Sequence, residues 1–201
     1  MHANSLRRAA IRYIQRQVER WTKQYRASQT DDLPEVEKLI AWLPRTLPEQ
    51  SRASIVHGDY RIDNLIYAQQ EPRVLAVLDW ELATIGDPLA DFTYLAMYWV
   101  MPRDGRSGLV GVDLEAEGLP TLDEVVAQYC DASGRERLEG LHWYFAYNLF
   151  RVVCILQGIK KRMIDGNASS SQAAATVENI ALLAKTAWSQ ALTAGEMYGS
   201  V

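Results

Sequence analysis

The sequence has 201 residues, enough for one domain with a sizeable core, so we expect a single domain spanning residues 1–201. Hydrophobic residues make up 48% and charged residues 23% of the chain, as is typical of soluble globular proteins. The formal net charge of -4 excludes the basic field of a nucleic-acid-binding protein, and no apolar run approaches the roughly 20 residues of a membrane span.

Two cysteines occur, Cys130 and Cys154, and neither belongs to a CxxC or histidine-rich pattern. Such isolated cysteines indicate reduced thiols rather than a disulfide or a zinc site. No apolar signal core is visible at the start of the sequence. We therefore expect a cytoplasmic protein without a membrane span and without a nucleic-acid partner.

Residues 1–53 are predicted to form a helical lead-in. A helix over residues 4–27 has one apolar stripe, made by Ile11, Ile14, Val18, Trp21 and Tyr25. Its basic residues indicate a solvated face, or alternatively a surface for a membrane or a phosphate-rich ligand. The segment 31–34 then offers an acidic cap and a first-turn proline for a helix that ends near residue 43, before a connector over 44–53.

Residues 54–91 are predicted to form the catalytic core, with short strands at 54–56, 65–67 and 74–78. The third strand is almost continuously apolar, which predicts burial on both of its faces. This places Asp79, which follows the strand directly, at the edge of the core. Asp87 and Pro88 form a cap and first-turn pair for an apolar helix that ends near residue 100.

The remainder, residues 92–201, is predicted to be helical apart from a glycine-containing surface loop over 101–120. Thr121 and Glu124 have the spacing of a capping box for a helix that ends near residue 131. Two longer helices are predicted at 136–163 and 171–192. The fold class is therefore α+β and mainly helical, with one small cluster of strands.

The residues with the clearest chemistry lie in the stretch HGDYRIDN and at the end of the third strand. Asp59 is followed by Asn64 five residues later, and Asp79 comes from the neighbouring strand. In ATP-dependent phosphoryl transfer an aspartate accepts the proton of the acceptor hydroxyl, while an asparagine and a second aspartate hold magnesium on the nucleotide phosphates. This pattern predicts Asp59 as the catalytic base and Asn64 and Asp79 as ligands of Mg²⁺ and ATP.

The segments HGDYRIDN and VLDWELATIGDPLAD resemble the catalytic core of the aminoglycoside phosphotransferase family, small-molecule kinases related to protein kinases. Protein kinases have His-Arg-Asp where this sequence has Gly58 in the middle position. The segments QRQVERWTKQYRAS and LFRVVCILQGIKKRMIDGNASS are similar to the acyl-CoA-dehydrogenase-associated branch of that family. The resemblance implies the C-terminal lobe of a protein-kinase-like fold that uses ATP and Mg²⁺.

Several residues are expected to support this set. His57 is predicted to hold the shape of the loop, and Arg61 is a candidate contact for substrate or phosphate. Glu81 lies close enough to Asp79 in sequence to assist a metal ion through water. Asp87 is expected to cap its helix, and the resemblance implies that Asp91 hydrogen-bonds to amides of the catalytic loop.

The family has an N-terminal lobe whose sheet carries a phosphate-covering loop and a lysine that pairs with the nucleotide phosphates. Only 56 residues precede His57, they are predicted to form mainly helices and a connector, and the sequence contains no GxGxxG. From the sequence we therefore expect the N-terminal lobe to be absent.

Three functions stay open at this point. The first is an ATP-dependent phosphotransferase lobe, inactive or incomplete alone, that acts on a small-molecule hydroxyl; the branch it resembles favours a hydroxyacyl-CoA-like metabolite over an aminoglycoside. The second is a non-catalytic binding or assembly module, or a truncated fragment, that depends on a partner N-lobe or on a homodimer. The third is a metal-dependent hydrolase that uses Asp59, Asn64 and Asp79 directly.

Overall fold

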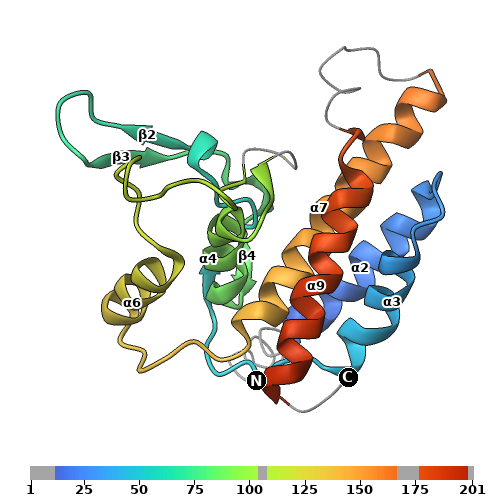
Figure 1. The fold of residues 1–201 in the computed structure, drawn as a ribbon, viewed down its shortest axis with the longest axis horizontal. Helices are drawn as coiled ribbons and strands as arrows, with labels where there is room; N and C mark the ends of the chain where they lie inside the picture. Colours follow the sequence, from blue (N-terminus) through green and yellow to red (C-terminus); the bar gives the residue numbers. More distant parts are fainter. Residues whose placement is uncertain (1–11, 104–107, 167–176, 199–201) are drawn as a thin grey trace, which may run out of the picture.

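The computed structural model describes residues 12–103, 108–166 and 177–198, and this part of the chain is mainly helical with two small sheets (Figure 1). Four helices lie side by side as a bundle: α2 (Tyr13–Ser28), α3 (Pro34–Trp42), α7 (Leu141–Ile164) and α9 (Ile180–Tyr198). The shorter α4 (Pro88–Ala96) packs against α7 and connects the bundle to the strands. The mainly helical fold class is confirmed.

The core of the bundle is built around α7. This helix is buried along most of its length, from Trp143 to Gly158. The apolar stripe of α2 is buried against it, with Ile14 and Val18 at 1% and 2% exposure, whereas Ile11 lies outside the described residues. The buried apolar residues form one cluster to which α2, α3, α4, α7 and α9 all contribute.

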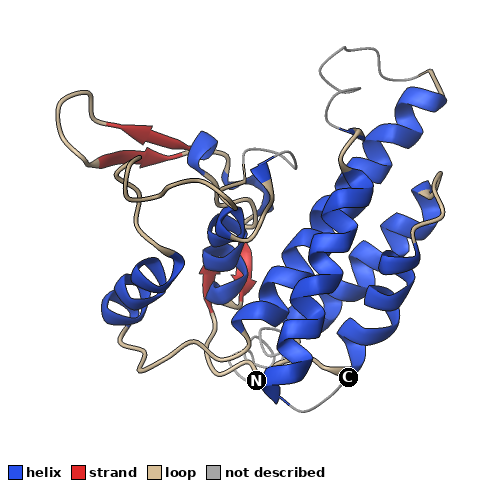
Figure 2. Ribbon diagram, viewed as in Figure 1, coloured by secondary structure: helices blue, strands red, loops and turns tan. Residues whose placement is uncertain are grey.

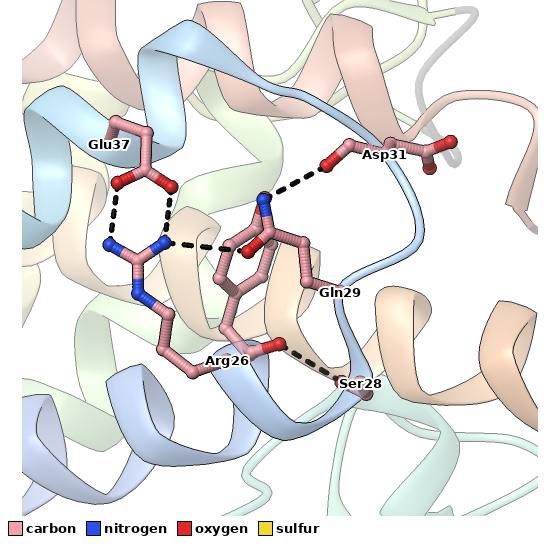
Figure 3. A network of polar contacts seen from close by, with 6 residues as sticks. Arg26, Ser28, Gln29, Asp31 and Glu37 are labelled. Carbon is pink, nitrogen blue, oxygen red and sulfur yellow. Dashed lines mark hydrogen bonds and ion pairs between the residues drawn. The ribbon is translucent and has the colours of Figure 1, made fainter.

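The turn between α2 and α3 is held by polar contacts. Arg26 donates through Nη1 and Nη2 to the two oxygens of the Glu37 carboxylate. Figure 3 shows the two side chains facing each other. Both are solvent-exposed, so this ion pair contributes about 0–1 kcal/mol to stability. The predicted acidic cap of α3 is wrong: its N-cap is Leu33, and the Asp31 carboxylate pairs with Lys160 on α7, 2.6 Å away.

The strands form two antiparallel pairs, drawn as red arrows in Figure 2. β1 (Ser54–Val56) pairs with β4 (Thr84–Gly86), and β2 (Leu65–Tyr67) pairs with β3 (Val74–Val77). Single turns of 3-10 helix occur at Leu43–Arg45, Ile62–Asn64, Trp80–Leu82 and Met97–Trp99. β4 is absent from the sequence prediction, because three residues carry little periodicity and their pairing partner is distant in sequence.

The predicted burial of the third strand on both faces is wrong. Val74 and Leu75 are 44% and 53% exposed, and the β2–β3 hairpin projects away from the bundle (Figure 1). The apolar run is real, but no described element packs over the hairpin. The apolar side chains of Val74 and Leu75 therefore lie on the surface and not in the core.

Helix ends follow the local backbone chemistry. α6 (Leu122–Ser133) begins with the predicted capping box, in which Thr121 and Glu124 bond to each other's backbone amides. α7 begins later than predicted because Gly140 takes a left-handed conformation (φ 72°) at its N-cap. The predicted start of the last helix lies outside the described residues, and its end lies at Tyr198 rather than near residue 192.

The described helices include none that is long and apolar enough to cross a membrane. Both cysteines are buried free thiols, as predicted.

Candidate active site

The predicted catalytic loop begins at the end of β1, where Val56 is fully buried. The next two residues, His57 and Gly58, are also buried, whereas Asp59 is half-buried and reaches the surface. Gly58 has a φ of 85°, and a Cβ there would lie 2.8 Å from the carbonyl oxygen of Leu82. This position therefore requires glycine for both its conformation and its space.

His57 is bonded through both ring nitrogens. Its Nδ1 accepts a hydrogen bond from the amide of Asp59 at 3.2 Å, which puts the ring proton on Nε2. Nε2 then donates to the carbonyl of Leu78, 2.7 Å away, and this residue directly precedes Asp79. His57 thus links the loop to the end of β3.

Two aspartates of α4 face inward. Asp91 accepts from the amides of His57 (2.5 Å) and Gly58 (2.9 Å) through its two carboxylate oxygens. Asp87 is the N-cap of α4; it accepts from the amide of Leu89 at 3.0 Å and from the hydroxyl of Tyr144 at 2.5 Å. Burial raises the pKa of both carboxyl groups above the ordinary value of 3.8. Both carboxylates thus accept hydrogen bonds from backbone amides.

Asn64 and Asp59 are in direct contact across the loop. The Nδ2 group of Asn64 donates to the Asp59 carbonyl at 2.9 Å and to its carboxylate Oδ2 at 3.2 Å. The single 3-10 turn at Ile62–Asn64 brings the chain back for this contact. Because Nδ2 is turned to Asp59, Oδ1 of the same amide is the atom that remains for a metal ion.

Asp79 lies beyond the end of β3 in a left-handed conformation, with φ 64° and ψ 55°. The amide of its neighbour Leu78 donates to the carbonyl of Asn64 at 2.8 Å, which ties this end of the strand to the loop. No other non-glycine residue in the described part of the chain has a positive φ. Asp79 is exposed, and the backbone hydrogen bond of the preceding residue, Leu78, connects it to Asn64.

The donor atoms of this set suit magnesium. Asn64 and Asp79 offer amide and carboxylate oxygens, the ligands that Mg²⁺ prefers. Within the described ranges, no group of three or more His, Cys, Asp or Glu residues is arranged to hold a metal. A Mg²⁺ ion on a nucleotide usually has one or two protein ligands, and phosphate oxygens and water complete its coordination. Asn64 and Asp79 therefore fit a substrate-bound ion better than a permanent one.

The two remaining candidates lie at the surface of the same region. Arg61 pairs with Asp63 through Nη2, so part of its charge is already compensated within the loop. Glu81 is exposed in the 3-10 turn that follows Asp79 and has no described contact with the set.

Residues of α7 that touch the candidate site are missing from the sequence prediction. Tyr144 bonds to Asp87, and Arg151 donates through Nη2 to the carbonyl of Gly58. Arg151 is only 6% exposed. The usable signal was a charged residue within a long apolar helix, since arginine is rarely buried without a specific partner.

Large apolar side chains are exposed around the candidate site. We call them the strand–loop apolar surface; they are Ile55, Ile62, Ile66, Tyr67, Val74, Leu75, Leu78, Trp80, Leu82 and Ile85. Each is between 43% and 68% exposed. An apolar surface of this kind, next to polar site residues, is typical of an interaction site.

Comparisons with known proteins give one family. The profile described as "Phosphotransferase enzyme family" matches residues 4–143. Acyl-CoA dehydrogenase family member 10 of Mus musculus is 43% identical over 185 residues, covering 91% of this chain and 17% of its own length. Family member 11 of Homo sapiens is 36% identical over 176 residues, covering 87% of this chain and 23% of its own length.

Among solved structures, a candidate aminoglycoside phosphotransferase from Ralstonia eutropha is 44% identical with a TM-score of 0.85. The match covers 90% of this chain and 56% of that one. The chain therefore spans about a fifth of the length of these curated relatives and somewhat more than half of the solved one.

Proposed function

The chain belongs to the phosphotransferase enzyme family, and from this membership we propose that it is the catalytic lobe of an ATP-dependent phosphotransferase acting on a small-molecule hydroxyl. The observation that carries the proposal is the direct contact of Asn64 with Asp59, beside the left-handed Asp79. In the proposed organisation, residues 1–201 are one domain that corresponds to the C-terminal lobe of a kinase-like fold. A cytoplasmic location stays a prediction.

In the proposed reaction Asp59 acts on the acceptor. Its carboxylate accepts the hydroxyl proton while the acceptor oxygen bonds to the γ-phosphorus and the bond from phosphorus to the ADP oxygen breaks. The Asn64 amide, 3.2 Å from Oδ2 of Asp59, keeps that carboxylate in one orientation. Holding a reacting group in place in this way is a large part of catalysis in phosphoryl transfer.

Asn64 and Asp79 are the residues that would hold magnesium. The bound ion would neutralise negative charge on the phosphates. The chain supplies the two ligands from two sides, Asn64 from the loop and Asp79 from the end of β3. The hydrogen bond from the Leu78 amide to the Asn64 carbonyl holds the loop and the strand end together.

A hydroxyacyl-CoA-like metabolite is the acceptor that we propose, rather than an aminoglycoside. The support is the name shared by the curated relatives, acyl-CoA dehydrogenase family members, at 36–43% identity. This chain matches 17% and 23% of the length of those relatives, so the acceptor is inferred from their name and not from an activity of the matched part.

A transfer assay tests the proposal. The 201-residue chain would be incubated with radiolabelled ATP, Mg²⁺ and a panel of hydroxyacyl-CoA thioesters and aminoglycosides. We expect a phosphorylated hydroxyacyl-CoA, with kcat about 10²–10⁴-fold lower in Asp59→Asn. Asp123→Asn, an exposed position in the first turn of α6, is the matched control and should be unchanged.

Two results would contradict this function. Equal transfer by the wild type and Asp59→Asn would remove Asp59 from the reaction. Phosphate-ester hydrolysis without nucleotide, lost in Asp79→Asn, would instead support the metal-dependent hydrolase.

A second candidate function is favoured by the strand–loop apolar surface. Ile55, Leu75 and Trp80 are 68%, 53% and 50% exposed, close to the residues proposed to hold the nucleotide. The solved relative has further chain beyond the matched 56%. We propose that a separate folded domain covers this surface and closes the nucleotide side, so that the chain also acts as a docking module.

Sedimentation velocity together with binding of an apolar dye tests this docking role. We expect a monomer that binds the dye, with binding reduced in Leu75→Glu and unchanged in Leu192→Glu, a matched exposed leucine on α9. A stable dimer that dissociates in Leu75→Glu would contradict a separate domain and identify a second copy as the occupant.

A further inference from the structure

One face of α7 carries three polar side chains that bond to the candidate catalytic loop or to α4 and its N-cap. Tyr144, Asn148 and Arg151 are spaced four and three residues apart, so they share a face of the helix. Tyr144 donates to Asp87, and Asn148 donates to the Ala90 carbonyl (3.1 Å) and to Thr93 Oγ1 (2.8 Å). These first two residues hold α4, and Arg151 continues the same row to the loop itself.

Arg151 is a buried cation with an unusual set of neighbours. Its guanidinium lies 4.6 Å from the ring centre of Tyr94 and 5.3 Å from that of Trp21. None of the ion pairs formed by the described residues includes Arg151. Burying a charge outside any ion pair is costly, even with two aromatic faces beside it and the Asp91 carboxylate near enough to interact with it electrostatically. Such a group is expected only where its specific hydrogen bond, here to a backbone carbonyl, is needed.

The accepting carbonyl belongs to Gly58, immediately before Asp59. The peptide between them is held at both ends: Arg151 bonds to its carbonyl, and the ring of His57 accepts from its amide. The preceding peptide is held by Asp91, which accepts from the Gly58 amide. Two successive peptide planes are thus fixed, and they set the direction in which the Asp59 side chain leaves the backbone.

We propose that Arg151 is a positioning residue that orients Asp59 from the buried face of α7 through the Gly58 carbonyl. The proposal deepens the phosphotransferase function and rests on it where catalysis is concerned. The orientation itself is a property of the chain and is measurable without any turnover.

Selective labelling isolates the peptide concerned. The only Gly–Asp sequences in the chain are Gly58–Asp59 and Gly86–Asp87. A protein labelled with ¹³C-carbonyl glycine and ¹⁵N aspartate therefore gives NMR correlations from these two peptides alone. The signal absent from Asp59→Asn belongs to Asp59, and the Asp87 signal reports on the fold next to α4.

We expect Arg151→Met to move or broaden the Asp59 signal while the Asp87 signal stays in place. Arg151→Lys keeps a charge and a donor but loses the planar group between the rings, so it should keep the fold and move the Asp59 signal less. Arg162→Met, an exposed arginine on the same helix, is the matched control. An Asp59 signal that stays in place in both Arg151 variants, or that moves only together with that of Asp87, overturns the proposal.

The kinetic test uses the same variants. A misplaced Asp59 should lower kcat by about 10- to 100-fold with little change in KM, whereas a residue that only stabilises the fold should leave kcat of the folded enzyme unaltered. Absence of transfer in the wild type would count against the phosphotransferase function and leave the NMR result to decide on Arg151. An altered Asp59 signal with unaltered kcat would overturn the catalytic part of the proposal alone.

Discussion

Asp79 occupies a backbone conformation that residues with a side chain rarely adopt. Its φ of 64° lies in the left-handed region, which costs most residues roughly 1–2 kcal/mol, although aspartate and asparagine tolerate it better than others. Strain of this kind persists where the surroundings enforce it, and it is concentrated at functional sites. The conformation therefore supports the role proposed for Asp79.

Substitution at this position has a predictable order of stabilities. Asp79→Gly should be more stable than Asp79→Ala by about 1 kcal/mol, because glycine takes a positive φ without steric cost. Urea denaturation measures both. The same pair at Glu19, an exposed position within α2, should show the reverse order, since alanine is favoured in a helix. Equal stabilities of the two Asp79 variants would contradict the account of the strain.

At the scale of elements, α4 and α7 are joined through a buried carboxylate. Asp87 is 2% exposed and is bonded to the hydroxyl of Tyr144 on α7. Burial raises its folded-state pKa above 3.8, although the bonds to Tyr144 and Leu89 act in the opposite direction. The stability contributed by this contact between α4 and α7 is therefore expected to depend on pH.

The sign of that dependence follows from linkage. With a raised folded-state pKa, the contribution of Asp87 to stability is fully present below 3.8 and is lost as pH rises through the folded-state pKa. The unfolding free energy of the wild type, minus that of the non-titrating Asp87→Asn, should therefore increase as pH is lowered from neutrality toward 3.8. Urea unfolding across this range measures it. A difference that stays constant or decreases would show that the folded-state pKa is not raised.

The elements that sequence predicts well are those governed by local contacts. The stripe of α2 and the capping box at Thr121 depend on residues three or four positions apart, and both are present as predicted. β4 depends on pairing with β1, some thirty residues earlier, and was missed. The exposure of Leu75 was also missed, because an apolar run does not reveal whether anything covers it.

The candidate site also contains both local contacts and contacts between residues distant in sequence. The Asp59–Asn64 contact spans five residues and was predictable from the motif. Arg151 reaches Gly58 from 93 residues away, and only the packing of α7 brings the two together. Contacts set by tertiary packing leave no regular spacing in the sequence.

At the scale of the whole molecule, a helical bundle built around α7 supports the small candidate catalytic segment, residues 54–91, on one side (Figure 1). Beyond that segment lies the strand–loop apolar surface, which the bundle does not cover. The arrangement fits the proposed function, in which this lobe positions metal and acceptor and a separate domain closes over the nucleotide.

Calorimetric titration of Mg·ATP into the 201-residue chain tests the central claim, that Asn64 and Asp79 hold the metal–nucleotide beside Asp59. We expect binding by the wild type and by Asp123→Asn, with affinity at least about tenfold (1.4 kcal/mol) weaker in Asp79→Asn. Asparagine tolerates the left-handed conformation, so this variant should keep the fold. No binding by the wild type, or equal affinity in Asp79→Asn, would contradict it.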